Sequence, residues 1–175
     1  PFSSSSNHMT VTFLEQPSLP QQVEDVLHPL VKEWFYSKYP SFSQPQLYGV
    51  KEIHERNNIL ISAPTGGTKT LTAFLSIINE LVTRSVNKEL QDRVYAVYLS
   101  PLKALNNDVA INLSTPLAEI TERAKEKGIT IDIRVGVRTG DTSPADRQKM
   151  LRKPPHILIS TPESLALMLT SYKFY

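Results

Sequence analysis

Apolar residues recur along the chain at two spacings, one typical of helices and one of strands. Gaps of three and four residues predict an amphipathic helix over residues 23–36, which Pro29 is expected to kink or divide into two short helices. A turn-like stretch, residues 39–45, precedes a second short helix predicted over residues 46–56. Residues 9–22 are interpreted as an irregular lead-in segment that precedes this helical region.

From residue 58 onward, short apolar runs alternate with helical patterns. Strands are predicted at residues 58–62, 94–99, 129–137 and 156–160, and helices at residues 69–84, 102–127, 144–152 and 162–170. The longest helix is expected to break near residues 114–116 and to stop at Gly128, since glycine is favoured just past a helix end. Strands that alternate with helices indicate an α/β fold, in which helices cover both faces of a parallel sheet.

Composition narrows the class of protein. The 175 residues are 40% hydrophobic, enough for one domain with a core and too few for two. Lys and Arg number 19 against 17 Asp and Glu, so a nucleic-acid site has to be a local patch. The absence of cysteine excludes disulfides, cysteine-ligated metals and a thiol nucleophile. The four histidines are scattered without ligand spacing, so we expect exposed or structural roles for them.

The chain shows neither a membrane span nor a secretory signal. No apolar run approaches the roughly 20 residues that a spanning helix needs, so we expect an intracellular protein without membrane contacts. Residues 1–8 are serine-rich, and His8 followed by Met9 resembles a cloning-site remnant. We therefore divide the chain into residues 1–8 of cloning origin, the lead-in at residues 9–22 and one domain at residues 23–175.

A candidate phosphate loop, Ala-Pro-Thr-Gly-Gly-Thr-Lys-Thr at residues 63–70, lies between a predicted strand and a predicted helix. Small residues let backbone N–H groups approach phosphate oxygens, and the helix N-terminus adds partial positive charge. Lys69 is placed to reach the β- and γ-phosphates of ATP, and the Thr70 hydroxyl to coordinate Mg²⁺, so both are candidate catalytic residues. The cofactor-binding residues predicted here are Thr65, Gly66, Gly67, Thr68, Lys69 and Thr70.

One position of this loop departs from the usual pattern. Thr68 stands where a glycine ordinarily precedes the lysine. A β-branched side chain narrows the cradle and resists some backbone angles, and Gly67 is expected to compensate in part. An ordinary glycine-rich turn between a strand and a helix remains the alternative interpretation.

Five segments occur in the order found in the N-terminal motor lobe of superfamily 2 helicases. They are Ser-Gln-Pro-Gln at 43–46, the loop at 63–70, Ser-Pro-Leu-Lys-Ala-Leu at 100–105, Val-Arg-Thr-Gly-Asp-Thr at 137–142 and Thr-Pro-Glu-Ser-Leu at 161–165. The chain resembles this family over residues 27–175 and is most similar to its Lhr-type and Ski2-like members. The resemblance implies a RecA-like P-loop NTPase with a three-layer, mainly parallel fold, incomplete at its C-terminal end, and an ATP-dependent helicase activity.

The resemblance also implies roles for single residues. Gln46 would read adenine, because its amide offers both a donor and an acceptor. Thr161 and Pro162 look like an N-cap followed by proline at the first helical position, a role compatible with phosphate contact. The turns after all four strands are expected on one rim, which ATP and nucleic acid would share. The implied nucleic-acid contacts are Pro101, Lys103, Arg138, Thr139, Gly140, Thr161 and Pro162.

The implied partners are DNA or RNA, as a single strand or duplex held by its backbone, and the second motor lobe of the intact protein. The expected location is the cytoplasm or the nucleoid. The family's acidic motif would follow Leu169, and no Asp-Glu pair occurs before Tyr175. Because hydrolysis needs metal ligation and an oriented water together, we expect the chain alone not to hydrolyse ATP.

Two other functions remain open. A non-catalytic nucleic-acid-binding or scaffold module with a degenerate phosphate loop is favoured by Thr68. A P-loop enzyme acting on a small molecule, such as a kinase, is disfavoured by the segments that follow the second and fourth predicted strands.

Overall fold

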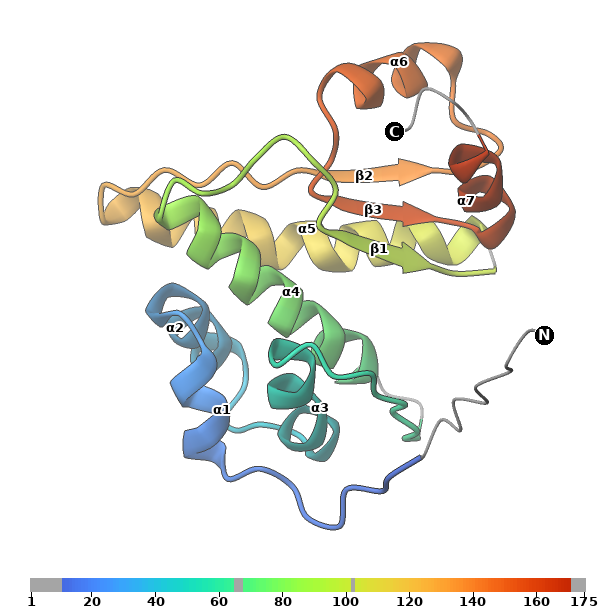
Figure 1. Cartoon of the computed structure of the whole chain (residues 1–175). Coiled ribbons are helices and arrows are strands. Elements are labelled where there is room, and N and C mark those ends of the chain that lie inside the picture. The colour runs from blue at the N-terminus through green and yellow to red at the C-terminus, as the bar shows by residue number, and fades with distance from the viewer. Residues whose placement is uncertain (1–10, 65–67, 102, 171–175) are drawn as a thin grey trace, which may run out of the picture.

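The computed structural model describes residues 11–64, 68–101 and 103–170, with the backbone alone at residues 68 and 103–108. These residues form seven helices and three strands, shown in Figure 1. In chain order they are α1 (Pro20–Val26), α2 (Pro29–Lys38), α3 (Gln44–His54), α4 (Thr68–Val86), β1 (Ala96–Leu99), α5 (Lys103–Glu126), β2 (Val135–Arg138), α6 (Pro144–Arg152), β3 (Ile157–Ser160) and α7 (Pro162–Leu169).

The three strands form one parallel sheet in the order β1-β3-β2. Ile157 of the central strand is in register with Ala96 on one side and Val135 on the other. All three arrows in Figure 1 point the same way, so their carboxyl ends share one edge. The expectation of a parallel sheet is confirmed.

Helices cover both faces of this sheet. Ile157 and Ile159 are fully buried in the main core, against apolar side chains of α4 and α5. Leu158, between them, faces the opposite side, where it lines a hollow with Met168 of α7. Alternate residues of β3 therefore serve two helical layers, because successive side chains of a strand point to opposite faces. The three-layer α/β architecture expected from the sequence is confirmed.

The long helix α5 is continuous, so the break expected near residues 114–116 is wrong. Pro116 lies inside it, although proline removes one backbone hydrogen bond. Leu113 and Leu117 are both buried on either side of the proline, and this packing holds the helix together. The stop at Gly128 is confirmed, because its φ of 73° is the left-handed conformation that ends helices.

The N-terminal region contains two short helices, as Pro29 predicted. His28 precedes Pro29 and caps α2, with its side chain accepting the N–H of Leu30 at 3.2 Å. The indole Nε1 of Trp34 donates to Glu119 of α5 at 2.7 Å, which ties α2 to the layer below the sheet. The lead-in expected at residues 9–22 ends earlier than predicted, because α1 begins at Pro20.

Residues 58–62 do not form the predicted strand. The segment 57–64 has no regular structure, and Leu60 is 94% exposed. A strand needs a neighbour to pair its backbone groups, and no strand of the described chain lies beside this segment. Ile61 in this segment packs on a helix instead, since its side chain approaches Gly49 of α3.

The outer edge of β1 is open. Among the described residues β1 pairs only with β3, and Val97 and Leu99 are 47% and 44% exposed. The sheet therefore ends in a row of unpaired main-chain groups with apolar side chains around it.

No helix in the described part of the chain combines the length and hydropathy needed to cross a bilayer.

Candidate nucleotide and nucleic-acid site

Helices α3 and α4 pack side by side and run in the same direction. Three contacts set their register. Gly49 of α3 lies so close to α4 that an added Cβ would be 2.6 Å from Cγ2 of Thr72. Further along the pair, the Ser76 hydroxyl donates to the carbonyl of Val50 at 3.0 Å, and Arg56 forms an ion pair with Glu80. Gln46 precedes Gly49 by three residues, as Lys69 precedes Thr72. The register therefore brings the predicted adenine reader to the same end as the phosphate-loop lysine.

The start of α3 carries polar groups suited to a ligand. Gln46 is 2% exposed, and its Oε1 accepts the backbone N–H of Ser43 at 2.8 Å. This bond fixes the amide, whose nitrogen can still donate to a base. The hydroxyl of Ser43 is buried and has no hydrogen-bond partner. Because buried polar groups are normally paired, this orphaned hydroxyl fits a site that a ligand completes.

At the start of α4, the ammonium group of Lys69 faces its own loop. It contacts the carbonyl of Ala63 and lies 3.4 Å from that of Pro64. This places the charge beside the loop that would cradle phosphates. Thr70 follows within the first turn of α4. The other predicted cradle residues, Thr65, Gly66, Gly67 and the side chain of Thr68, lie outside the described residues.

A metal ion would depend on Thr70 and on the phosphates themselves. Within residues 11–64, 68–101 and 103–170, no cluster of three or more His, Cys, Asp or Glu side chains could hold one. Mg²⁺ is usually bound through few protein ligands together with substrate phosphates and water. The residues present fit a nucleotide-borne Mg²⁺ better than a dedicated protein cage.

The turns after β1 and β3 lie beside one another at the carboxyl edge of the sheet. The N–H of Ser100 donates to the carbonyl of Ser160 at 3.1 Å, which extends the ladder into both turns. Pro101 is exposed there, and Lys103 begins α5 with its side chain outside the described part. These two segments were predicted to contact nucleic acid, and the fold brings them together.

The predicted cap at Thr161 is confirmed. Its hydroxyl accepts the N–H of Ser164 at 3.3 Å and donates to the Ser164 hydroxyl at 3.1 Å, and Pro162 is the first residue of α7. Thr161 is only 3% exposed. Its side chain is therefore committed to the cap. Because Pro162 has no N–H and those of Ser164 and Leu165 donate to Thr161, a phosphate at this turn would meet the backbone N–H of Glu163.

The turn after β2 is held by its own hydroxyl groups. The N–H of Thr139 donates to Thr142 Oγ1 at 2.9 Å, and the N–H of Asp141 donates to Thr139 Oγ1 at 3.3 Å. The carbonyl of Gly140 accepts from the guanidinium of Arg147 at 3.0 Å. These bonds give the turn one defined shape at the carboxyl edge of β2.

Arg138, the last residue of β2, is half-buried and directed toward α6 and α7. It lines a hollow of about 340 Å³ together with Met150, Leu158 and Met168. Burial lowers the pKa of Arg138, and the positive charge of Arg147 lowers it further. The Arg138 side chain therefore lies partly beneath the carboxyl edge of the sheet and is not fully exposed there.

Three of the four predicted turns share the carboxyl edge of the sheet, whereas residues 65–67 of the fourth, the phosphate loop, lie outside the described residues. The phosphate loop precedes α4, which lies between the sheet and α3 (Figure 1). Residues 58–62 do not join the sheet, and Ile61 in this segment approaches Gly49 of α3. The expectation that ATP and nucleic acid share one rim stays a prediction.

Sequence reasoning missed Arg147 and Ser43. A signal for Arg147 was present, because Ser143 follows the 138–142 turn directly and caps α6. A helix that begins immediately after a turn places its second-turn residues beside that turn. The orphaned hydroxyl of Ser43 depends on packing and leaves no such signal.

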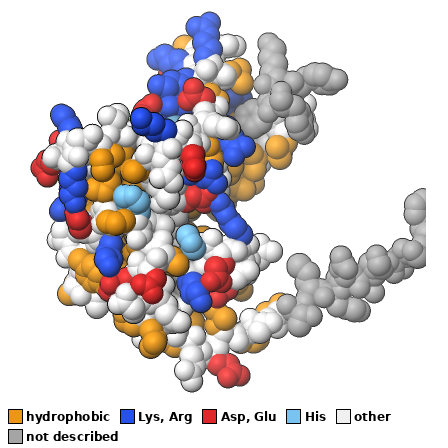
Figure 2. All heavy atoms as spheres, turned by 60° about the vertical axis from the view of Figure 1, so that its left-hand side comes forward, with side chains coloured by type: hydrophobic (Ala, Val, Ile, Leu, Met, Phe, Trp, Pro, Cys, Tyr) orange, Lys and Arg blue, Asp and Glu red, His pale blue; other side chains and the backbone are white. Residues whose placement is uncertain are grey.

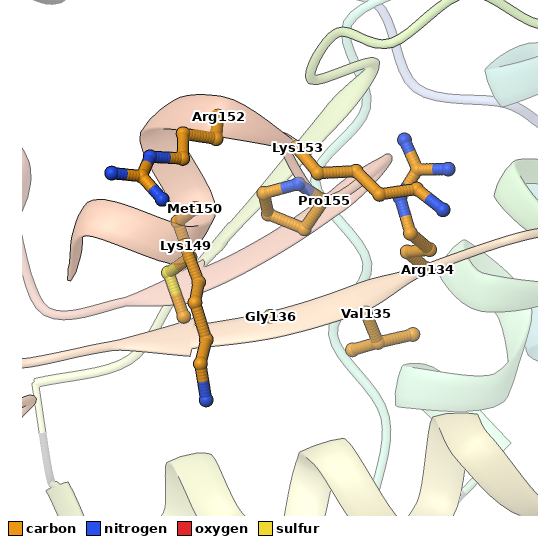
Figure 3. A pocket seen from close by; sticks show the side chains of 8 residues that line it. All are labelled: Arg134, Val135, Gly136, Lys149, Met150, Arg152, Lys153 and Pro155. Atoms are coloured by element: carbon orange, nitrogen blue, oxygen red, sulfur yellow. The ribbon is translucent and has the colours of Figure 1, made fainter. Parts of the chain in front are cut away.

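Most charged side chains elsewhere lie near side chains of the opposite charge. Figure 2 shows acidic and basic groups interspersed over one face of the molecule. A second hollow, of about 450 Å³, lies between α6 and β2, where Figure 3 shows cationic side chains around Gly136 and Pro155. Three of its four cations are paired with acidic groups: Arg134 and Lys153 with Asp132, at 3.1 and 3.5 Å, and Lys149 with Asp146, at 3.5 Å. Local neutralisation argues against this hollow as a nucleic-acid patch.

Comparison with known proteins agrees with this geometry. Residues 43–174 match the DEAD/DEAH box helicase model. The chain is 54% identical over 165 residues to the ATP-dependent helicase Lhr-Core of Methanocaldococcus jannaschii, covering 94% of the chain and 20% of that protein. It is 42% identical to the Lhr helicase/uracil glycosylase of Escherichia coli, covering 90% of the chain and 10% of that protein.

A solved structure shows the same likeness. The structure of Mycobacterium smegmatis helicase Lhr bound to ssDNA and AMP-PNP matches with a TM-score of 0.75 and 44% identity, over 84% of this chain and 18% of that one. The chain thus spans between a tenth and a fifth of the length of these relatives, at 10%, 18% and 20%. The family match, the Lhr-type relatives and the shared RecA-like fold lead to one conclusion: the chain belongs to the DEAD/DEAH box helicase family.

Proposed function

We propose that the chain is the nucleotide-binding part of the first motor lobe of an ATP-dependent nucleic-acid helicase. The observation that carries this proposal is the parallel register of α3 and α4, by which Gln46 and Lys69 belong to the same end of the helix pair. Relatives named ATP-dependent helicases support it, as does the similar Lhr structure, which is bound to ssDNA and AMP-PNP.

ATP would lie across the common end of the two helices. Gln46 and Ser43 would bind the base, and Lys69 would bind the β- and γ-phosphates. Residues 65–68 would supply backbone N–H groups to the same phosphates. Mg²⁺, held by Thr70 and the phosphates, would neutralise phosphate charge.

A nucleic-acid strand would lie along the carboxyl edge of the sheet. Its backbone would contact the turns that follow β1, β2 and β3, through Pro101, Lys103, Arg138, Thr139, Gly140, Thr161 and Pro162. Contacts of this kind do not distinguish bases, so the proposed partner is DNA or RNA without sequence preference. The second motor lobe is the proposed protein partner, and the cytoplasm or nucleoid the proposed location.

In this proposal the chain binds the nucleotide but does not hydrolyse it by itself. Hydrolysis also needs acidic groups that act on the metal and the attacking water, and a cation that stabilises the transition state. We expect the 175-residue chain to bind the nucleotide weakly and to show no turnover above background. Turnover that disappears in Lys69→Ala would contradict this expectation.

The test is a titration of the chain with a fluorescent ATP analogue and Mg²⁺. Lys69→Ala should abolish binding, and Thr68→Gly should strengthen it by relieving the crowded cradle. Lys125→Ala, which removes an exposed lysine near the end of α5, is the matched control and should bind like the parent. Equal binding by the parent and Lys69→Ala would overturn the proposed phosphate site.

A second candidate function is a non-catalytic nucleic-acid-binding module. Two observations favour it: Thr68 replaces the usual glycine, and the Lys69 ammonium contacts carbonyls of its own loop. Binding by Thr68→Gly with none by the parent would support this module. Lys69-dependent binding by the parent would rule it out.

A further inference from the structure

Two arginines converge on the turn that follows β2. Arg138 ends the strand, and Arg147 reaches back from α6 to donate from Nη2 to the carbonyl of Gly140 at 3.0 Å. The Arg147 charge contributes, after burial, to the lowered pKa of Arg138. The bond to Gly140, two residues after Arg138, brings the Arg147 guanidinium to the end of β2, although the two arginines belong to different elements.

Neither arginine has an acidic partner in the part of the chain that the structure describes. Arg147 Nε is in addition buried without a hydrogen-bond partner. Among the other cations of the α6 region, Lys149 pairs with Asp146 and Lys153 pairs with Asp132, both at 3.5 Å, and Arg152 is exposed to solvent. Arg138 and Arg147 differ from these residues because they lack an acidic partner and are also partly buried.

This arrangement is costly unless an anion binds. A guanidinium remains charged at all ordinary pH values, and like charges repel more strongly where water is partly excluded. A buried donor without an acceptor adds a further desolvation penalty. One anion between the two side chains would offset both costs.

The chemistry of the anion follows from its position. The turn lies at the carboxyl edge of the sheet, beside the turns after β1 and β3, where the proposed strand passes. Planar guanidinium donors match the oxygen geometry of phosphate, often in a bidentate way. We propose that Arg138 and Arg147 form a clamp for one backbone phosphate of the nucleic-acid strand, a step that rests on the proposed function.

Arg147 has two separable tasks in this clamp. One Nη2 hydrogen bond holds Gly140, and the remaining donors and the positive charge serve the phosphate. Glutamine can supply a donor to Gly140 but no charge, whereas lysine keeps the charge but loses the planar fork. The two substitutions therefore distinguish a phosphate contact from mere support of the turn.

The experiment measures binding of a fluorescent single-stranded oligonucleotide by anisotropy across a salt series. The slope of log K against log salt reports the number of phosphates contacted, at about 0.7 per contact for single strands. Arg147→Gln should lower the slope by about 0.7 and weaken binding roughly tenfold at low salt. Arg147→Lys should keep the slope while binding more weakly.

Arg152→Gln is the matched control, because it removes an exposed arginine from the last turn of the same helix. Its slope should equal that of the parent. Thermal melting of each variant by circular dichroism verifies that the fold is retained. If Arg147→Gln melts at a lower temperature than the parent, Arg138→Gln replaces it as the test. A lower slope in Arg138→Gln, with the melting temperature of the parent, would support the clamp equally.

Two outcomes separate the clamp from the function on which it rests. Salt-sensitive binding by the parent, with an unchanged slope in the folded Arg147→Gln and Arg138→Gln variants, would overturn the clamp alone. A parent that binds no oligonucleotide at low salt would overturn both the proposed nucleic-acid rim and the clamp.

Discussion

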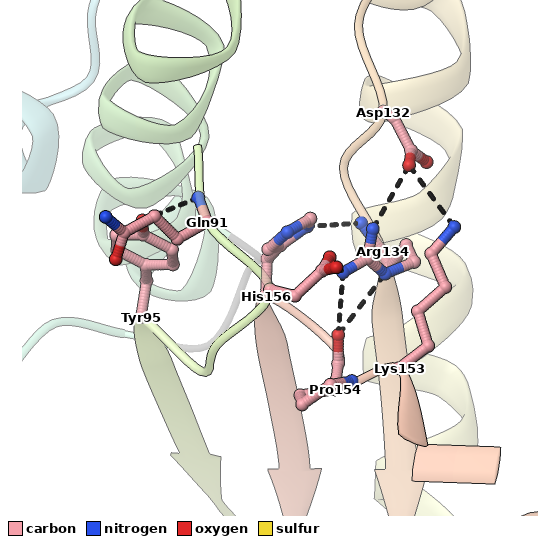
Figure 4. Close-up of polar contacts among 8 residues, drawn as sticks. Gln91, Tyr95, Asp132, Arg134, Lys153, Pro154 and His156 are labelled. Carbon is pink, nitrogen blue, oxygen red and sulfur yellow. Dashed lines mark hydrogen bonds and ion pairs between the residues drawn. The ribbon is translucent and has the colours of Figure 1, made fainter. Parts of the chain in front are cut away.

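The imidazole Nδ1 of His156 accepts the backbone N–H of Arg134 at 3.0 Å, which joins the start of the central strand to the start of β2 (Figure 4). The Arg134 side chain strengthens this junction by donating to the carbonyl of Pro154 at 3.0 Å. His156 is only 2% exposed. Its burial lowers its pKa, and the nearby charge of Arg134 lowers it further, against opposing effects of Asp132 and Asp92.

This junction predicts a loss of stability in mild acid. A histidine whose folded pKa is lowered is neutral in the folded protein and takes up a proton more readily when unfolded. Its stabilising contribution is therefore complete above the unfolded pKa of about 6.5 and declines as the pH falls below it. The free energy of unfolding, from urea titrations, should be smaller at about pH 5.5 than at about pH 7.5.

His156→Gln, whose amide oxygen can accept the same N–H, should show a weaker pH dependence than the parent. The buried His28 also has a lowered pKa, so only the difference between parent and variant isolates His156. His54→Gln, on an exposed site at the end of α3, is the control. Identical pH dependence in the parent and His156→Gln would refute the prediction.

Gly136 is expected to tolerate no side chain. An added Cβ would lie 2.8 Å from Cγ and 2.9 Å from Cβ of Pro155 (Figure 3), and a proline ring cannot rotate away. Gly136→Ala should lower the free energy of unfolding by about 1–3 kcal/mol. Adding Pro155→Ala should recover part of this loss, and strictly additive costs in that double-mutant cycle would argue against the contact.

The bond from Trp34 to Glu119 should contribute measurably to stability. Glu119→Ala leaves the indole N–H of Trp34, a residue 2% exposed, without its acceptor, which should cost about 1–3 kcal/mol. Glu119→Gln keeps an acceptor and should cost less. The chain has one tryptophan, so its fluorescence can follow unfolding in urea. The exposed Glu122→Ala should change stability by less than about 0.5 kcal/mol, and an equal effect of both alanine variants would negate the prediction.

The cap at Thr161 should be replaceable by serine but not by alanine. Thr161→Ala removes the acceptor for the Ser164 N–H, which should cost about 1 kcal/mol of stability. Thr161→Ser retains the hydroxyl and should remain close to the parent in thermal melting. A serine variant as unstable as the alanine variant would show that the threonine methyl group, rather than the cap, stabilises this turn.

Most of the fold could be predicted because most elements bury one side. Helix α6 has the bounds expected from its pattern, Pro144–Arg152, and the strand expected at residues 156–160 contains β3. The strand expected at residues 129–137 is shorter, because β2 spans only Val135–Arg138. Two other errors share a cause, which is that periodicity shows which residues are apolar but not what lies beside them. The run at residues 58–62 lacks a strand neighbour, and Pro116 is tolerated through packing of Leu113 and Leu117.

The candidate site was predictable only where local sequence creates it. The phosphate loop and the cap at Thr161 depend on consecutive residues, so their patterns are visible without a structure. The bond from Arg147 to the Gly140 carbonyl, and the position of Gln46 and Lys69 at the same end of α3 and α4, depend on how separate elements pack. Helix register and burial are tertiary properties, and a single sequence does not record them.

We expect the open edge of β1 to affect how the chain behaves in solution. Within the described part of the chain, the outer N–H and C=O groups beside Val97 and Leu99 have no strand partner, so they can pair with the same edge of another molecule. Two copies could join their sheets in this way, and the join would strengthen as protein concentration rises. Oligonucleotide and nucleotide titrations should therefore be run with dilute protein, and a charged residue at position 97 should keep the chain monomeric without touching either binding region.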